Sequence, residues 1–224
     1  MPISHRGAHD SLPENSIPAF LRAIDLGAKG IELDVHATRD GTLVVHHDPV
    51  IQTGDLRDGR RARIIDLTVH ELAQFPLAEG IFVPTLAEVL HAVGERATVF
   101  VEIKARNIEP LVVRSIRESR TDCAVHSFDH RIVKTVKRLF PAIRTGILEV
   151  GRHLDPTRAL AETGAQDLWQ QVEFIDEDLV TRAHRAGARV IAWTANDIPQ
   201  WKTLGQIGVD GICTDRVGEL AATT

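Results

Sequence analysis

The chain alternates between short apolar runs and longer stretches in which apolar residues recur at helical spacing. The short runs predict eight β-strands, at residues 3–5, 30–35, 98–103, 124–128, 145–148, 167–170, 189–194 and 211–214. The longer stretches predict helices over 17–26, 86–93, 111–119, 132–140, 176–186 and 198–204. Strands that alternate with helices are typical of a parallel sheet with helical crossovers. Eight strands in 224 residues predict an α/β fold of the (β/α)8 TIM-barrel type.

One stretch departs from this alternation. The run Thr38-Arg39-Asp40-Gly41 has the composition of a tight turn, and residues 42–46 read as a strand leaving it. We therefore expect a short β-hairpin extension after the second strand, which carries His47 back over the barrel mouth. Residues 55–63 are polar and basic and predict a surface loop that could cover a site as a lid. The alternative fold is a doubly wound sheet, which is disfavoured because no glycine-rich phosphate loop follows the first strand.

Composition narrows the class of protein. The length predicts one domain over residues 1–224, since domains commonly hold roughly 100–200 residues. A net charge of −5 disfavours a nucleic-acid or membrane-surface binder, which would need a basic face. Cys123 and Cys213 lie in apolar runs and predict two small core residues in a reducing compartment. With no signal peptide and no apolar run of about 20 residues, we expect a cytoplasmic protein without a stable membrane anchor.

Carboxylates and a lysine gather on two of the predicted strands. Glu32 and Asp34 share one face of their strand, because residues two apart in a strand point the same way. Glu102 and Lys104 repeat the pattern on the next parallel strand. Two carboxylates on one face repel each other unless a cation lies between them. Oxygen ligands favour Mg²⁺, Ca²⁺ or Mn²⁺ over zinc, so the sequence predicts a site for a hard divalent cation.

Histidines and an arginine complete the predicted chemistry. His5 and Arg6 end the first strand, where a guanidinium suits the oxygens of a phosphate. His47 returns on the hairpin, and two histidines beside a phosphate can act as general acid and general base. His126 is a secondary candidate near a strand end. A structural role is the better interpretation for the other histidines, namely His9, His36, His70, His91, His130, His153 and His184, while His46 should face away from His47.

Three further positions stay open between a structural and a functional role. Pro13-Glu14-Asn15-Ser16 can cap the first helix, or Glu14 and Asn15 can orient the site. Trp193 can form an apolar wall for a substrate or pack in the core. Asp215 ends the last strand at the same rim of the barrel.

Taken together, the motifs cover nearly the whole chain: His5-Arg6-Gly7, Pro13-Glu14-Asn15, Ile31-Glu32-Leu33-Asp34-Val35, His47-Asp48, Glu102-Ile103-Lys104, Ser127-Phe128, Trp193-Thr194-Ala195-Asn196 and Gly208 to Asp215. In this order they resemble the glycerophosphodiester phosphodiesterase family. The chain departs from the family's pattern at Ser16, where threonine is usual, at Gln52-Thr53-Gly54, where an Arg-Thr-Thr run is common, and after Asp215, where proline is common. These departures leave the predicted catalytic set intact.

The resemblance implies a TIM barrel that hydrolyses glycerophosphodiesters to sn-glycerol 3-phosphate and an alcohol, in lipid and glycerol metabolism. It implies attack of the glycerol 2-hydroxyl on phosphorus and a cyclic phosphate, as in phosphatidylinositol-specific phospholipase C. The resemblance implies one divalent metal, Mg²⁺ or Ca²⁺ with Mn²⁺ as an alternative, held by Glu32, Asp34 and Glu102. It implies that His5 and His47 are the acid/base pair. It also implies that Arg6 and Lys104 contact the phosphate. The preferred head group and the oligomeric state, including a homo-oligomer, stay open.

Two alternatives remain beside this hypothesis. A lysophospholipase D-type activity would keep the mechanism and change the substrate, but it needs an acyl groove that the polar residues 55–63 do not suggest. A non-catalytic phosphodiester-binding barrel would be expected to have lost a metal ligand or a histidine, and none is missing here.

Overall fold

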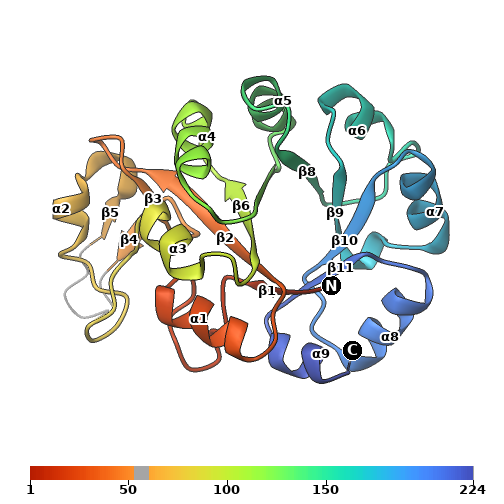
Figure 1. Cartoon of the computed structure of the whole chain (residues 1–224), viewed down its shortest axis with the longest axis horizontal. Helices are drawn as coiled ribbons and strands as arrows, with labels where there is room; N and C mark the ends of the chain where they lie inside the picture. Colours follow the sequence, from red (N-terminus) through yellow and green to blue (C-terminus); the bar gives the residue numbers. More distant parts are fainter. Residues whose placement is uncertain (53–60, 224) are drawn as a thin grey trace.

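We describe the protein from a computed structural model that places residues 1–52 and 61–223. Eight parallel strands form a barrel, which closes because the first strand pairs with both the second and the last. The strands are β1 (Pro2–His5), β2 (Gly30–Ala37), β6 (Thr98–Ile103), β7 (Cys123–Ser127), β8 (Arg144–Glu149), β9 (Asp167–Gln171), β10 (Arg189–Trp193) and β11 (Gly211–Thr214). Figure 1 shows these strands in the middle of the molecule and the helices around them. The predicted TIM barrel is confirmed, and all eight predicted strands are present.

Helices cover the outside of the barrel. They are α1 (Ile17–Asp25), α3 (Leu86–Val93), α4 (Glu109–Glu118), α5 (His130–Leu139), α6 (Arg158–Thr163), α7 (Glu177–Arg185), α8 (Ile198–Gln206) and α9 (Val217–Thr223). The six predicted helices are confirmed, whereas α6 and α9 were not predicted because each is too short to show a helical period. In the described part of the chain, none of the helices is long and apolar enough to cross a bilayer.

The predicted hairpin is confirmed as well. Strand β3 (Leu43–Val45) runs antiparallel to β2, and the turn between them is closed by a hydrogen bond from Gly41 N to Thr38 O of 3.0 Å. Beyond it lie a two-stranded sheet of β4 (Val50–Gln52) and β5 (Arg61–Arg63), the 3-10 helix η1 (Ile64–Asp66) and the short helix α2 (Val69–Leu72). The lid predicted over 55–63 falls mostly on residues outside those described, and its last three residues form β5.

Apolar residues fill two layers of the fold. One layer lies between the strands and the surrounding helices. The other lies inside the barrel, where Ile3, Phe100 and Trp169 belong to one buried cluster with Cys213. The rings of Phe100 and Trp169 meet edge to face with centroids 5.2 Å apart. This interior cluster forms an apolar floor below the mouth of the barrel. A further 3-10 helix, η2 (Val172–Phe174), follows β9.

Candidate active site

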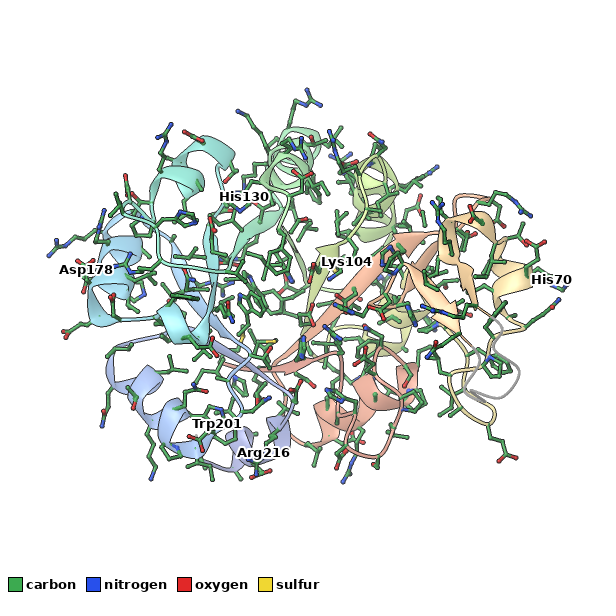
Figure 2. The ribbon with its side chains drawn as sticks, turned by 180° about the vertical axis from the view of Figure 1, so that it is seen from behind. His70, Lys104, His130, Asp178, Trp201 and Arg216 are labelled. Carbon is green, nitrogen blue, oxygen red and sulfur yellow. The ribbon has the colours of Figure 1, made fainter. Side chains whose placement is uncertain are left out.

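A cavity of about 160 Å³ lies at the mouth formed by the carboxyl ends of the strands. Parallel pairing brings side chains of neighbouring strands to one level, because Asp34 on β2 aligns with Glu102 on β6, and Glu102 aligns with His126 on β7. Lys104 follows β6 directly, and Figure 2 shows it near the middle of the molecule. Of the predicted site residues, the cavity is lined by His5, Arg6, Glu32, His47, Glu102, Lys104 and Trp193.

Asp34 is the predicted site residue that does not line this cavity. Its side chain is buried, and its carboxylate accepts a hydrogen bond of 2.9 Å from Asn15 Nδ2. Arg6 Nε lies 3.3 Å from Oδ2, and Lys104 Nζ lies 3.3 Å from Oδ1. Burial alone would raise the pKa of Asp34, but Lys104 and Arg6 outweigh burial and hold the pKa below its ordinary value. Asp34 is therefore an anion that fixes two cationic side chains at the edge of the cavity.

The loop before α1 supports this cluster. Asn15 adopts φ 55°, a left-handed conformation that asparagine tolerates better than most residues. Its backbone N donates to Arg6 O at 2.9 Å, and its side chain accepts a hydrogen bond from Asp34 N at 3.3 Å. Glu14 Oε1 lies 3.1 Å from Arg6 Nη1, while Ser16 caps α1. The Pro-Glu-Asn-Ser motif therefore both begins the helix and orients the site, which answers a question that the sequence left open.

Glu32, Glu102 and His126 form a buried group whose ligand atoms, one from each residue, all lie within 4.8 Å of one another. Glu102 Oε1 is 2.9 Å from Lys104 Nζ. Glu32 Oε2 is buried without a hydrogen-bond partner among the described residues. Burial, helped by the charge of Asp34, raises the pKa of Glu32, and burial raises the pKa of Glu102. A cation between these carboxylates would relieve their repulsion, so the group can hold a metal.

His5 is held by a carboxylate from the other end of the chain. Its Nδ1 lies 2.7 Å from Asp215 Oδ1, His9 Nε2 lies 3.1 Å from the same oxygen, and Asn196 Nδ2 donates to Oδ2 at 2.6 Å. Burial lowers the pKa of His5, but the hydrogen bond to Asp215 and the charge of Glu32 outweigh burial and raise it above its ordinary value. Because the carboxylate can only accept, Nδ1 of His5 carries the proton and Nε2 is left for the cavity.

The hairpin places His47 at the cavity. The carbonyl of His47 accepts a hydrogen bond of 3.0 Å from His36 Nε2, and His46 N donates to Asp34 O at 3.0 Å. Nδ1 of His47 lies 2.8 Å from Asp48 Oδ1. The ring therefore resembles that of His5, with Nδ1 on a carboxylate and Nε2 without a protein partner among the described residues. His46 does not line the cavity, as its neighbouring position in the strand predicted.

An apolar wall closes one side of the cavity. Trp193 ends β10, and its ring packs edge to face against Phe128, with centroids 5.4 Å apart and planes at 79°. Leu148 also lines the cavity. Phe128 is 44% exposed, so part of its ring is free to contact a ligand. Sequence reasoning did not place Phe128 in the site, although its position directly after β7 was a usable signal.

His9 is a further residue whose place was missed, since a structural role was expected for it. Arg6 and Gly7 both have positive φ, 55° and 87°, and this turn folds the chain back so that His5 and His9 reach the same carboxylate. A Cβ on Gly7 would lie 2.7 Å from Ala19 Cβ, so glycine is needed for this close approach. Nothing in the periodicity of the sequence predicts such a turn.

A (β/α)8 barrel whose ionisable side chains meet at the carboxyl ends of its strands has the architecture of a barrel enzyme, because that face carries the active site in this fold. Residues 5–219 match the model of the glycerophosphoryl diester phosphodiesterase family. A glycerophosphodiester phosphodiesterase of Caldanaerobacter subterraneus subsp. tengcongensis is 32% identical over 95% of this chain and 93% of its own length. A Mycobacterium tuberculosis relative named probable glycerophosphodiester phosphodiesterase 2 is 32% identical over 96% of this chain and 86% of its own.

Solved structures agree in fold. A glycerophosphodiester phosphodiesterase from Thermotoga maritima superposes with a TM-score of 0.85 at 26% identity, and covers 100% of this chain and 98% of its own. An Oleispira antarctica phosphodiesterase in complex with the product sn-glycerol-3-phosphate superposes with a TM-score of 0.89 at 23% identity, over 99% of this chain and 96% of its own. The chain belongs to the glycerophosphoryl diester phosphodiesterase family.

Proposed function

We propose that the protein hydrolyses glycerophosphodiesters to sn-glycerol 3-phosphate and an alcohol, with His5 and His47 as the proton-transfer pair. One observation carries this proposal: the two histidines line the same cavity as Arg6 and Lys104. The two cations suit an anionic phosphate, and the histidines can exchange protons with its substituent oxygens. The relatives named for this activity, and the Oleispira antarctica phosphodiesterase solved with sn-glycerol-3-phosphate, support the same substrate class.

In the proposed reaction, the 2-hydroxyl oxygen of the glycerol moiety bonds to phosphorus while one histidine takes its proton. The bond between phosphorus and the head-group oxygen breaks, and the other histidine donates a proton to the departing alcohol. The hydrogen bond to Asp215 helps to raise the pKa of His5, so we assign the donor role to His5, which leaves the acceptor role to His47. Water then opens the cyclic phosphate: His5 takes a proton from the water, and His47 returns its proton to the glycerol oxygen.

The residues present fit a divalent cation. Glu32 and Glu102 offer buried carboxylate oxygens, and one of these, Glu32 Oε2, has no hydrogen-bond partner among the described residues. Asp34, predicted as a third ligand, is bonded to Asn15 and ion-paired with Arg6 and Lys104, so it would have to exchange one of these contacts for the metal. When bound, a divalent cation would stabilise negative charge on the nonbridging phosphate oxygens.

The proposed function is tested by measuring release of sn-glycerol 3-phosphate from glycerophosphocholine. The protein is stripped with EDTA and then supplied with Mg²⁺, Ca²⁺ or Mn²⁺. We expect turnover only with a metal, and we expect His47→Ala to lower kcat by about 10²–10⁴-fold. His70→Ala changes an exposed histidine of α2 at the periphery of the molecule, as Figure 2 shows, and is the matched control. Turnover that survived EDTA or His47→Ala would contradict the proposed mechanism.

The same assay defines the substrate. Glycerophosphocholine, glycerophosphoethanolamine and lysophosphatidylcholine share the phosphodiester and differ in the head group or the acyl chain. The apolar wall of Trp193, Phe128 and Leu148 contributes to a cavity of only about 160 Å³. We therefore expect the small diesters to have the higher kcat/KM. A preference for lysophosphatidylcholine would identify a lysophospholipase D-type activity instead.

A further inference from the structure

His126 is a buried residue of the mouth that the proposed acid–base chemistry does not use. It lies on β7 and is 1% exposed. Its ring stacks on that of Trp169, with centroids 4.2 Å apart and planes at 13°. The Trp169 ring in turn lies where Gly146 leaves room for it, since a Cβ on Gly146 would be 2.8 Å from Trp169 Cδ1. This packing holds the imidazole in one orientation against the carboxylates of the site.

Neither nitrogen of His126 has a hydrogen-bond partner among residues 1–52 and 61–223. Nδ1 is buried without one, and Nε2 lies 3.7 Å from Glu32 Oε1, which is beyond hydrogen-bond distance. Most buried polar atoms in proteins are hydrogen-bonded, so an orphaned imidazole needs an explanation. Nε2 is the nitrogen that faces Glu32, so it is the one placed to bind a cation between the carboxylates.

The ion pairs around these carboxylates involve Lys104 and Arg6. Lys104 pairs with Glu102 and Asp34, and Arg6 pairs with Asp34. In the described part of the chain, no lysine or arginine forms an ion pair with Glu32. One ligand atom each from His126, Glu32 and Glu102 therefore converge within 4.8 Å, and among residues 1–52 and 61–223 Lys104 is the basic residue that forms an ion pair with the group.

We propose that His126 supplies a nitrogen ligand, through Nε2, to the divalent metal held by Glu32 and Glu102, and that the site therefore binds Zn²⁺ and Mn²⁺ more tightly than Ca²⁺. The proposal rests on the proposed function, which requires a metal at this place. Calcium takes oxygen ligands almost exclusively, whereas imidazole nitrogen is a good ligand for transition metals. Carboxylates alone would make a site that prefers hard cations such as Ca²⁺. Adding one imidazole nitrogen shifts the metal preference of the site towards transition metals.

The first experiment looks for the nitrogen directly. The chelator-stripped protein is loaded with Mn²⁺, and electron spin-echo envelope modulation is recorded on protein with natural-abundance and with ¹⁵N-labelled histidine. We expect a coordinated-nitrogen signal that changes on labelling. We also expect it to disappear in His126→Gln and to persist in His5→Gln and in His47→Gln, which remove the other two imidazoles that line the cavity. A wild-type spectrum without histidine nitrogen would overturn the proposal, whether or not any variant folds.

The second experiment measures affinity. Equilibrium dissociation constants for Zn²⁺, Mn²⁺ and Ca²⁺ are measured by calorimetry on wild-type protein, His126→Gln and the exposed-site control His70→Gln. We expect His126→Gln to weaken Zn²⁺ binding at least about 10-fold, the loss that even outer-shell partners of a metal ligand can cause. We expect a smaller effect on Ca²⁺ and none from His70→Gln. Equal losses for Zn²⁺ and Ca²⁺ would show that His126 acts only through packing.

The two hypotheses fail in different ways. If the protein hydrolyses glycerophosphocholine in a metal-dependent way but Mn²⁺ shows no histidine nitrogen, the role of His126 is wrong and the proposed function is unaffected. Nitrogen ligation in a protein that does not hydrolyse glycerophosphodiesters would do the reverse. Neither spectroscopy nor calorimetry depends on turnover, so each result can be read without the other.

Discussion

At the scale of single residues, Asp215 favours the protonated form of His5 at the mouth of the barrel. It accepts from His5 and faces His9 through the same oxygen, and these contacts, with that of Asn196, outweigh burial and hold its pKa below the ordinary value. We predict that Asp215→Asn lowers the pKa of His5, measured by ¹⁵N-resolved NMR titration of the imidazole. The same substitution at Asp210, which binds His184 at 2.8 Å on the opposite end of the barrel, should leave His5 unchanged. An unshifted His5 in Asp215→Asn would contradict this positioning role.

The same pair predicts how stability depends on pH. A histidine whose pKa is raised on folding adds stability that is present below its unfolded pKa, about 6.5, and is lost as the pH rises through the folded value. An aspartate whose pKa is lowered adds stability that is present above its unfolded pKa, about 3.9. The destabilisation by Asp215→Asn should therefore be largest between about pH 4 and 6.5 and should shrink towards pH 9. Urea melts at several pH values measure it, and a pH-independent difference would refute the charge pair.

Single residues were predictable from the sequence where strand geometry governs them. Alternation along β2 placed Glu32 and Asp34 on one face, as the structure has them near Glu102. Their partners were not predictable, because they depend on which strands are neighbours and on loop turns. Asp34 forms ion pairs with Arg6 and Lys104 and is not left free, as its place on the strand face had suggested. The left-handed turn at Arg6 leaves no signal in the hydrophobic pattern.

At the scale of elements, strand β8 makes room for a neighbouring ring because it carries a glycine, Gly146, which has no side chain. Gly146 on this strand lies against Trp169, and a Cβ there would be 2.8 Å from the indole and 3.2 Å from Asp167 Cβ. We predict that Gly146→Ala destabilises the protein by about 1–3 kcal/mol, the usual cost of overpacking a core. Thermal and urea unfolding measure the change. Because His126 stacks on the same indole, the substitution should also weaken metal binding.

Gly205 on α8 is the matched control for this substitution. A Cβ added to it meets no atom within 4 Å, and the residue has no positive φ. Gly205→Ala should therefore leave the metal site unchanged and stabilise the helix by up to about 1 kcal/mol, because alanine is the better helix former. If Gly146→Ala proved as stable as wild type, the close packing of Trp169 against β8 would be wrong.

Elements were predictable in proportion to their length and regularity. The six predicted helices carry an apolar face over two or more turns, and each ends within two residues of its predicted bounds. Helix α6 buries only Leu160 and Thr163, and α2 spans only Val69–Leu72, so neither repeats an apolar position often enough to be recognised. The sheet of β4 and β5 was not predicted, because its strands have three residues each and residues 55–63 read as a polar surface loop.

At the scale of the whole molecule, barrel closure is what turns scattered residues into one site. His5 and Asp215 are 210 positions apart and meet because β1 pairs with β11. Strand count and alternation predicted this closure, so the ring of site residues was predictable as a set. The depth of each residue was not, because it depends on the register between strands, which aligns Glu102 with His126 as well as with Asp34.

Closure also concentrates negative charge in the barrel mouth, where Glu32 and Glu102 lie buried and close together. A cation that binds only the folded protein stabilises it by mass action, by about 2.7 kcal/mol at a concentration of 100 Kd. We predict that Mn²⁺ raises the Tm of the EDTA-stripped protein. Glu32→Gln should raise the Tm of the stripped protein, because it removes a buried charge that no lysine or arginine among the described residues pairs with. It should also abolish the further rise with Mn²⁺.

Calorimetric melts at pH 7.5, with and without metal, measure all four combinations of protein and cation. The decisive quantity is the difference between wild type and Glu32→Gln in the rise of Tm caused by Mn²⁺, and not either Tm alone. If Mn²⁺ stabilised Glu32→Gln as much as wild type, the cation would bind elsewhere, and the carboxylates of the mouth would not be its ligands. If Glu32→Gln destabilised the stripped protein, Glu32 would have a compensating partner, and neither its burial nor its repulsion from Glu102 would govern the stability of the empty site.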